Sequence, residues 1–381
     1  MIKKRIEVLD SLRGIASLQV VISHVLSAIP FLFLVLFKHK NEEFLTKDFW
    51  YYIRNSPLHF MWNGSGAVIV FFVLSGFVLS LPYFGKSSNN YKIYFVKRLV
   101  RLYLPCFAII TLAIICADLF YSSAKLNSYS DWLHVIWSQP FTSEYLTKVY
   151  LLNAYYNNID SVLWTLPIEI QLSLILPFFL YFFRKLNFAF SIATVLVYII
   201  FYHSLVKFKV IELIPALSVL FYFTFFITGS LICKYKENFI GFFDGISSIQ
   251  YWLLFCLAIV LYTTEYSLWW LPTNLSMILT KIPVDYYYWL SASLLMGFTL
   301  SKRFESFLSS TPLLWMGKIS FSLYLTHMVV IALVACILPS AINAYIVIGI
   351  GLLVSFIFAP FYYKFIEVPS LNVAKKLSGY L

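Results

Sequence analysis

The sequence has few charged residues and, among them, few acidic ones. Only 12% of its 381 residues are Asp, Glu, Lys or Arg, and 17 acidic residues stand against 28 basic ones. A hydrophobic fraction of 61% and a mean hydropathy of +0.82 exclude an ordinary soluble domain. We therefore expect an all-α polytopic membrane protein, in which helices satisfy their own backbone polar groups.

Cysteine is also scarce, and its placement excludes a zinc site. The five cysteines lie in apolar runs with no Cys-x-x-Cys pair and no histidine at a suitable spacing, so we interpret them as packing residues and expect no metal. A cleavable signal peptide is not expected, because the first apolar run has spanning length and no small-residue cleavage site. Only 18 residues follow the last apolar run, so no fused extracytoplasmic domain is expected.

Ten apolar segments are predicted to cross the membrane and to form a single domain over residues 1–381. They are 15–37, 64–84, 102–121, 161–183, 187–205, 211–233, 250–264, 284–300, 314–338 and 344–363. With the N-terminus inside, the inside segments hold eighteen Lys and Arg residues and the outside segments nine. This bias predicts that both termini are cytoplasmic, and the net charge of +11 then reflects topology rather than nucleic-acid binding.

The first segment begins with LDSLRGIASLQVVISH at 9–24, where Arg13 precedes His24 by eleven residues. Eleven residues turn a helix by about 1100°, so the two side chains lie within about 20° on one face and about 16 Å apart along the axis. An ionisable group at mid-membrane costs about 2.5–3.5 kcal/mol, so His24 is expected to face a protein interior or a wet cavity. A buried histidine that only holds two helices together is the alternative.

The inside segment Gly85–Arg101 carries five basic residues and no acidic one. Arg98 and Arg101 are three positions apart and project from one face of a helix that continues into the third span. Guanidinium groups bind phosphates bidentately, which suits an anionic donor at the membrane surface. The alternative is positive-inside charge in contact with anionic lipid.

The fourth segment opens with DSVLWTLPIEIQ, which places Glu169 about 12 Å from the outer boundary, at a depth similar to that of His24. A carboxylate and an imidazole at one depth can form a base and its orienting partner, which together activate a hydroxyl for acyl transfer. The alternatives are a structural His24–Glu169 pair and the proton relay of a secondary transporter.

Two further patterns are weaker. FFVLSGFVLS at 71–80 places Ser75 and Gly76 among bulky residues, which predicts close packing of two helices. GKISFSLYLTH at 317–327 places Tyr324 and His327 on one helix face. His327 is a second candidate titratable group, with packing and function both open.

Six motifs, in order, resemble the acyltransferase family 3 of membrane proteins. They are LDSLRGIA with the Arg13–His24 spacing, FFVLSGF, the Arg98–Arg101 pair, WTLPIE ending in Glu169, GKISFSLYLTH and FIEVP at 365–369. Together they extend from about residue 6 to about residue 370.

The resemblance implies a ten-helix membrane enzyme that transfers an acyl group, usually acetyl from acetyl-CoA, to a hydroxyl of a cell-surface glycan or lipid-linked saccharide. It implies that Arg13, His24 and Glu169 belong to the catalytic site, and that Arg98 and Arg101, with Arg13, bind the donor. Acyl-CoA, the saccharide acceptor and the bilayer are the expected partners, and nucleic acid is not. A bacterial-type inner (cytoplasmic) membrane is the expected location.

Overall fold

The computed structural model describes residues 2–38, 49–85, 90–138, 140–153, 158–207, 217–268 and 271–378, and all secondary structure within these ranges is helical. Seven helical stretches there are long and apolar enough to cross a membrane. They are built on α1 (Ile2–Ala28), α4 (Gly64–Phe84), α5 (Tyr91–Phe120), α9 (Thr165–Phe183), α10 (Phe188–Lys207), α18 (Thr311–Ile337) and α19 (Ala344–Tyr362). The chain is thus a multi-pass helical membrane protein.

Three other predicted segments also contain helices, but these are shorter or bent. They are α11 (Leu217–Lys234), α13 (Ser248–Tyr262) and α16 (Val284–Leu300). The pair formed by α11 and α12 (Lys236–Gly245), bent by 77°, gives an eighth span if it is counted as one. The start of the predicted segment 211–233 lies outside the described residues. Ten membrane crossings therefore stay a prediction.

The predicted bounds of the first segment, 15–37, are wrong at both ends. The helix already begins at Ile2 and it ends at Ala28. Ile29 is extended before Pro30 because a proline disfavours the helical conformation in the residue that precedes it. The chain then continues through the short α2 (Pro30–Phe33) and η1 (Leu34–Lys38).

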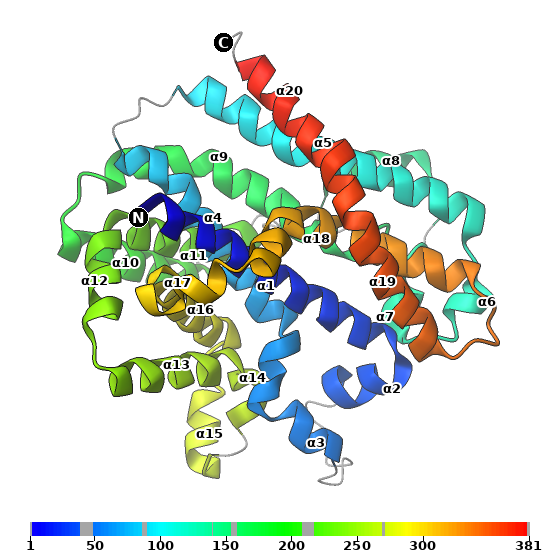
Figure 1. Ribbon diagram of the computed structural model, residues 1–381, viewed down its shortest axis with the longest axis horizontal. Helices are drawn as coiled ribbons and strands as arrows, with labels where there is room; N and C mark the ends of the chain where they lie inside the picture. Colours follow the sequence, from blue (N-terminus) through cyan, green and yellow to red (C-terminus); the bar gives the residue numbers. More distant parts are fainter. Residues whose placement is uncertain are drawn as a thin grey trace.

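Several short helices lie toward the bottom and right of Figure 1, whereas both chain ends lie toward the left and top. They include α3 (Phe49–Arg54), α6 (Ser123–Leu126), α7 (Asp131–His134), α14 (Thr264–Ser267) and α15 (Thr273–Leu279). Helix α19 is followed directly by η6 (Tyr363–Glu367) and α20 (Val368–Ser378). The termini therefore share one side of the molecule.

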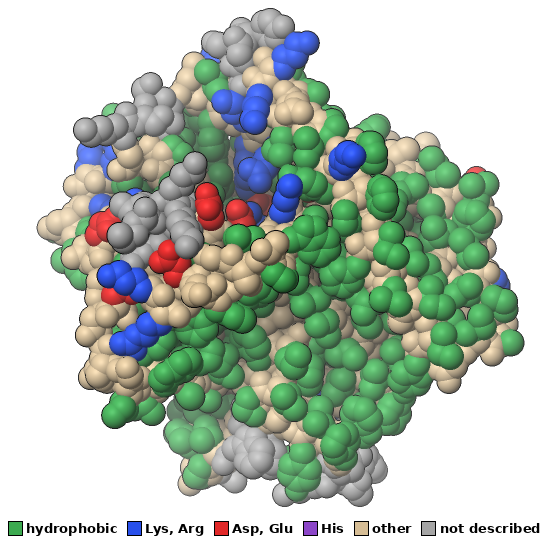
Figure 2. Space-filling model, in the orientation of Figure 1, with side chains coloured by type: hydrophobic (Ala, Val, Ile, Leu, Met, Phe, Trp, Pro, Cys, Tyr) green, Lys and Arg blue, Asp and Glu red, His purple; other side chains and the backbone are tan. Residues whose placement is uncertain are grey.

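Helix α18 lies at the centre of the bundle, since 83% of its most apolar 18-residue stretch is buried. In α10 only 11% of the equivalent stretch is buried. In a bilayer, exposed apolar side chains such as those of α10 contact lipid rather than water. Figure 2 shows a hydrophobic surface over the lower and right parts of the molecule, with charged side chains toward the top and upper left.

Helix α4 crosses α11 at two glycines. A Cβ added at Gly76 would overlap the backbone of Phe226, and one added at Gly229 would overlap the carbonyl oxygen of Val73. Small residues at such a crossing let two backbones approach closely. The close packing predicted at Ser75–Gly76 is confirmed.

Candidate active site

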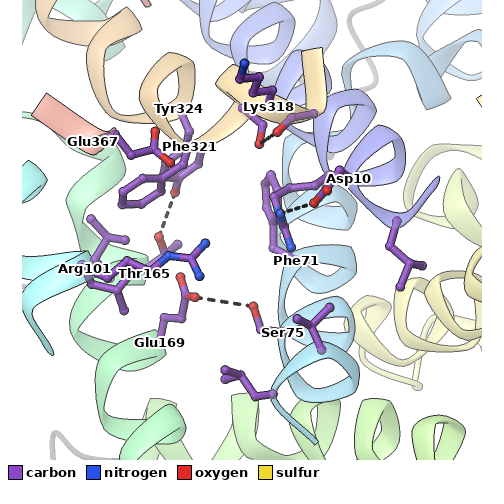
Figure 3. Close-up of a pocket in the computed structure, with 18 of the residues that line it drawn as sticks. Asp10, Phe71, Ser75, Arg101, Thr165, Glu169, Lys318, Phe321, Tyr324 and Glu367 are labelled. Carbon is purple, nitrogen blue, oxygen red and sulfur yellow. Dashed lines mark hydrogen bonds and ion pairs between the residues drawn. The ribbon is translucent and has the colours of Figure 1, made fainter. Parts of the chain in front are cut away.

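A cavity of about 680 Å³ lies among α1, α4, α5, α9 and α18. Figure 3 shows Glu169 and Thr165 on one side of it, Ser75 and Phe71 on another, and Tyr324 and Lys318 on α18. The charged residues of its wall are Glu7, Asp10, Arg13, Arg98, Arg101, Glu169, Lys318 and Glu367. The structure thus brings together four of the five residues predicted for the site, all except His24.

Arg98 and Glu169 form an ion pair inside this cavity. One guanidinium nitrogen of Arg98 on α5 lies 2.5 Å from Oε1 of Glu169 on α9, and the hydroxyl of Ser75 donates to the same oxygen at 3.5 Å. The Arg98 side chain is only 9% exposed and that of Glu169 24%. Arg98 therefore holds a fixed position that depends on Glu169.

The other basic groups of the cavity are held differently. Arg13 is paired with Asp10 at 2.6 Å, and the ammonium of Lys318 lies 5.4 Å from the centre of the Tyr363 ring. Arg101 is exposed and forms no ion pair or hydrogen bond with the described part of the chain. An anion entering the cavity would meet Arg101 without having to displace a carboxylate.

Tyr324 lines the cavity and lies near His327. Its hydroxyl donates to the carbonyl of Val162 at 3.1 Å and shares a 2.8 Å hydrogen bond with Thr165. Its ring lies 5.8 Å from that of Phe71 and 6.3 Å from that of His327. Tyr324 therefore belongs to the cavity wall and also contacts the histidine pair through His327.

His24 is bonded to His327 and not to Glu169. Nδ1 of His24 lies 2.9 Å from Nε2 of His327, and Nδ1 of His327 lies 3.0 Å from the carbonyl oxygen of Leu323. His24 is half-buried and His327 is fully buried. The predicted base with Glu169 as its orienting partner is therefore not formed here, since the two residues are bonded to different groups.

The segment between α5 and α9 also contacts His24. The ring of Trp132 on α7 lies 4.9 Å from the His24 ring. Ser130, at the start of α7, donates its hydroxyl to the carbonyl of Ser27 at 2.5 Å and its N–H to that of Ala28 at 3.1 Å. These bonds tie α7 to the end of α1 and hold Trp132 against the imidazole.

Helices α1 and α18 run parallel and in register through this region. Ser17 donates to the carbonyl of Ser320, and His24 meets His327, both at a separation of 303 positions. A Cβ added at Gly14 would lie 2.6 Å from the backbone nitrogen of Gly317, at the same separation. The glycine contact lets the two backbones approach so closely that the two imidazoles meet.

The pairing of the two histidines was missed by the sequence analysis, although a signal was present. GIASLQVVISH at 14–24 and GKISFSLYLTH at 317–327 each place a serine three positions and a histidine ten positions after a glycine. Glu367 in FIEVP, which accepts a 2.6 Å hydrogen bond from Ser322 beside the cavity, was also missed. The described residues contain no group of His, Cys, Asp and Glu side chains that could hold a metal ion.

A buried carboxyl group caps the short 3-10 helix η3 (Ser161–Trp164), which leads into α9. Asp160 is fully buried, and its Oδ1 accepts a long hydrogen bond from the N–H of Val162. Its Oδ2 has no partner within the described residues. Burial raises the pKa of Asp160 to about 8 because desolvation disfavours the charged form.

Comparison with known proteins gives two matches. A family model described as an acyltransferase domain matches residues 6–364. Nodulation protein 10 of Rhizobium leguminosarum bv. viciae is 27% identical over 284 residues, which cover 69% of this chain and 71% of that protein. No solved structure matches the chain.

Proposed function

From the premise that the chain belongs to the acyltransferase domain family and is an acyltransferase, we propose that its donor is cytoplasmic acyl-CoA, in the first instance acetyl-CoA. The proposed acceptor is a hydroxyl of a cell-surface glycan or lipid-linked saccharide. We place the enzyme in a bacterial-type inner membrane, with ten crossings and both termini in the cytoplasm.

The observation that carries the donor assignment is the charged cavity. Four basic side chains, on three helices far apart in the sequence, meet around one space of about 680 Å³. Cavities of roughly 300–1,000 Å³ are typical of small-molecule sites, and arginine forks suit phosphate oxygens. Arg101 supports the proposal most directly because it is the exposed arginine whose guanidinium is not already bonded to a carboxylate of the described chain.

In this proposal the nucleotide phosphates occupy the end of the cavity near Arg13, Arg101 and Lys318. The pantetheine arm extends along the cavity toward Phe71 and Tyr324, and the thioester is presented to His24 beyond these rings. Asp10 and Glu169 compete with the phosphates for two of the arginines, so donor binding should depend on salt and on the exact number of phosphates.

His24 is proposed as the general base for the acceptor hydroxyl. Its Nε2 takes the hydroxyl proton while the oxygen forms a bond to the thioester carbonyl carbon. The carbon–sulfur bond then breaks, and the thiolate receives the proton from His24 and leaves as the free thiol. A transient acyl group on His24 itself is the other route, and it consumes the same donor.

The transporter alternative has less support. A proton relay that uses both His24 and Glu169 requires a hydrogen-bonded path between them, yet each is bonded to a different residue. Membership of an acyltransferase family also favours chemistry over transport.

The test is acyl transfer in proteoliposomes with labelled acetyl-CoA on one side of the membrane. We expect release of free thiol and labelled ester on a saccharide acceptor when the donor faces the side that carries the termini. The acceptor class is tested by comparing ester-linked acetate on surface glycans of cells with and without the gene. Equal acetylation in both would contradict the proposed acceptor.

A further inference from the structure

The direction of the His24–His327 hydrogen bond follows from the other bond that His327 makes. The carbonyl oxygen of Leu323 can only accept, so Nδ1 of His327, 3.0 Å away, carries a proton and donates. In a neutral ring the other nitrogen, Nε2, then has a lone pair and accepts. His24 must therefore donate from Nδ1 across the 2.9 Å contact.

The same hydrogen-bond directions determine which ring nitrogen of His24 is unprotonated. With its proton on Nδ1, the neutral ring has its lone pair on Nε2. His24 is half-buried, and its Nε2 takes no hydrogen bond from the described part of the chain. The nitrogen that a general base needs is thus the one that remains available to a substrate hydroxyl.

We propose that His327 is the positioning residue of this site, a buried acceptor that holds His24 in the tautomer whose Nε2 faces the acceptor hydroxyl. The proposal rests on the proposed role of His24 as a base. When Nε2 takes the hydroxyl proton, the imidazolium of His24 keeps its Nδ1–H bond to Nε2 of His327. When the thiolate leaves, it takes the proton from Nε2, and His327 ends in the state in which it began.

The arrangement has the logic of a catalytic triad, in which a buried acceptor on the far side of the imidazole sets its tautomer and stabilises its charged form. Here the hydrogen-bond acceptor is a second imidazole, that of His327. The carbonyl of Leu323 in turn sets the tautomer of His327. The in-register packing of α1 and α18 keeps the two rings together.

If His327 only stabilises the fold, its bond to Leu323 is the one that matters; if it positions His24, its bond to His24 matters. Two variants separate these roles. In His327→Gln the side-chain carbonyl reaches the position of Nε2 and can still accept from His24. In His327→Asn the amide reaches only the position of Nδ1, so it keeps the bond to Leu323 and loses the bond to His24.

Turnover is measured per folded molecule, together with the KM for acetyl-CoA. We expect His327→Gln to stay within about tenfold of the parent. In His327→Asn, kcat should fall by about 10²–10⁴-fold, as for an imidazole held in the wrong tautomer, at an unchanged donor KM. Asn activity equal to or above Gln activity would overturn the proposal.

A double-mutant cycle gives the second test. If His327 acts through His24, replacing His327 by Asn in the His24→Asn background should change turnover by less than about threefold, because the two residues act as a unit. Independent, multiplying losses would contradict a positioning role.

The tautomer itself can be read without any assay of transfer. Nitrogen NMR of protein labelled in its histidine rings, in bilayers, should show His24 protonated at Nδ1 and unprotonated at Nε2, assigned by comparison with His24→Asn. In His327→Asn this state should no longer dominate. A proton on Nε2 of His24 in the parent would overturn the inference, whereas absent transfer from acetyl-CoA with the expected tautomer would contradict only the proposed donor.

Discussion

At the scale of the residue, His24 is the group on which the proposed chemistry depends. We expect His24→Asn to insert and purify like the parent, because one hydrogen-bonding side chain replaces another. Its acyl transfer should fall by about 10²–10⁴-fold, the usual contribution of general acid–base catalysis, and more acetyl-CoA should not restore it.

The control is His134→Asn, which changes an exposed histidine of α7 and should leave transfer unchanged. Transfer by His24→Asn within tenfold of the parent, per folded molecule, would remove the catalytic role of this residue.

The two arginines of α5 should differ, because their surroundings differ. Arg101→Ala should raise the KM for acetyl-CoA about tenfold or more, since a charged hydrogen bond contributes roughly 1.5–3 kcal/mol, and should leave thermal stability unchanged. Arg101→Lys should restore binding only in part. Lys97→Ala, on an exposed face of the same helix, is the matched control, and an unaltered donor KM in Arg101→Ala would contradict the donor site.

The sequence suggested that Arg98 is a charge at the water boundary, but the structure places it in a different environment. Because it is buried and paired with Glu169, Arg98→Ala should lower the melting temperature as well as donor use, since it leaves a carboxylate without its partner. Glu169→Gln in the same background should recover part of the lost stability. No recovery of melting temperature in the double variant would count against this explanation.

Asp160 should make stability fall as pH rises. Its pKa of about 8 in the folded protein exceeds the value of about 3.9 for an exposed aspartate. The folded state therefore holds a proton between about pH 4 and 8 that the unfolded state has lost, and stability decreases across this window. Asp160→Asn keeps the bond to Val162 and should reduce this decrease in melting temperatures measured from pH 5 to 8. An identical slope in parent and variant would refute this assignment.

At the scale of the element, glycines decide how closely the helices approach. Gly76→Ala should destabilise the protein by about 1–3 kcal/mol or more, because the added methyl overlaps the backbone of α11. Gly317→Ala should separate α1 from α18 and lower turnover per folded molecule, because it moves His327 relative to His24. Gly349→Ala, where an added Cβ meets nothing within 4 Å, should be neutral or slightly stabilising.

These variants are compared by thermal unfolding in detergent and by transfer per folded molecule. If Gly349→Ala lost as much stability as Gly76→Ala, helix crossing would not be the cause. A Gly317→Ala variant with parental turnover would show that the histidine contact does not depend on this crossing.

At the scale of the whole molecule, the orientation in the membrane can be tested with single cysteines. Asn238 on α12 and Asn127 next to α6 are both exposed, on opposite sides of the bundle. In intact cells an impermeant thiol reagent should label Asn127→Cys and not Asn238→Cys, and the parent serves as the blank. The reverse pattern would overturn the predicted cytoplasmic termini.

The sequence by itself determined the class of this protein. Apolar composition and repeated runs of spanning length require a helical membrane protein, because a bilayer offers backbone polar groups no water to bind. The family could also be recognised, since its motifs are short, local and in a fixed order. His24 and Glu169 were singled out because an ionisable group inside an apolar run is costly, and Arg98 and Arg101 because paired guanidinium groups at a membrane surface suit phosphates.

Only the tertiary structure decided which of these residues act together. Depth along a helix can be estimated from the sequence, but the direction in which a side chain points depends on how the helices rotate and cross. Glu169 and His24 have similar predicted depths, yet Glu169 is bonded to Arg98 and His24 to His327. The latter pairing arises from two glycine-containing helices in register, a contact between residues 303 positions apart. The similar spacing of Gly, Ser and His marks both helices in the sequence, but it does not say that they pack against each other.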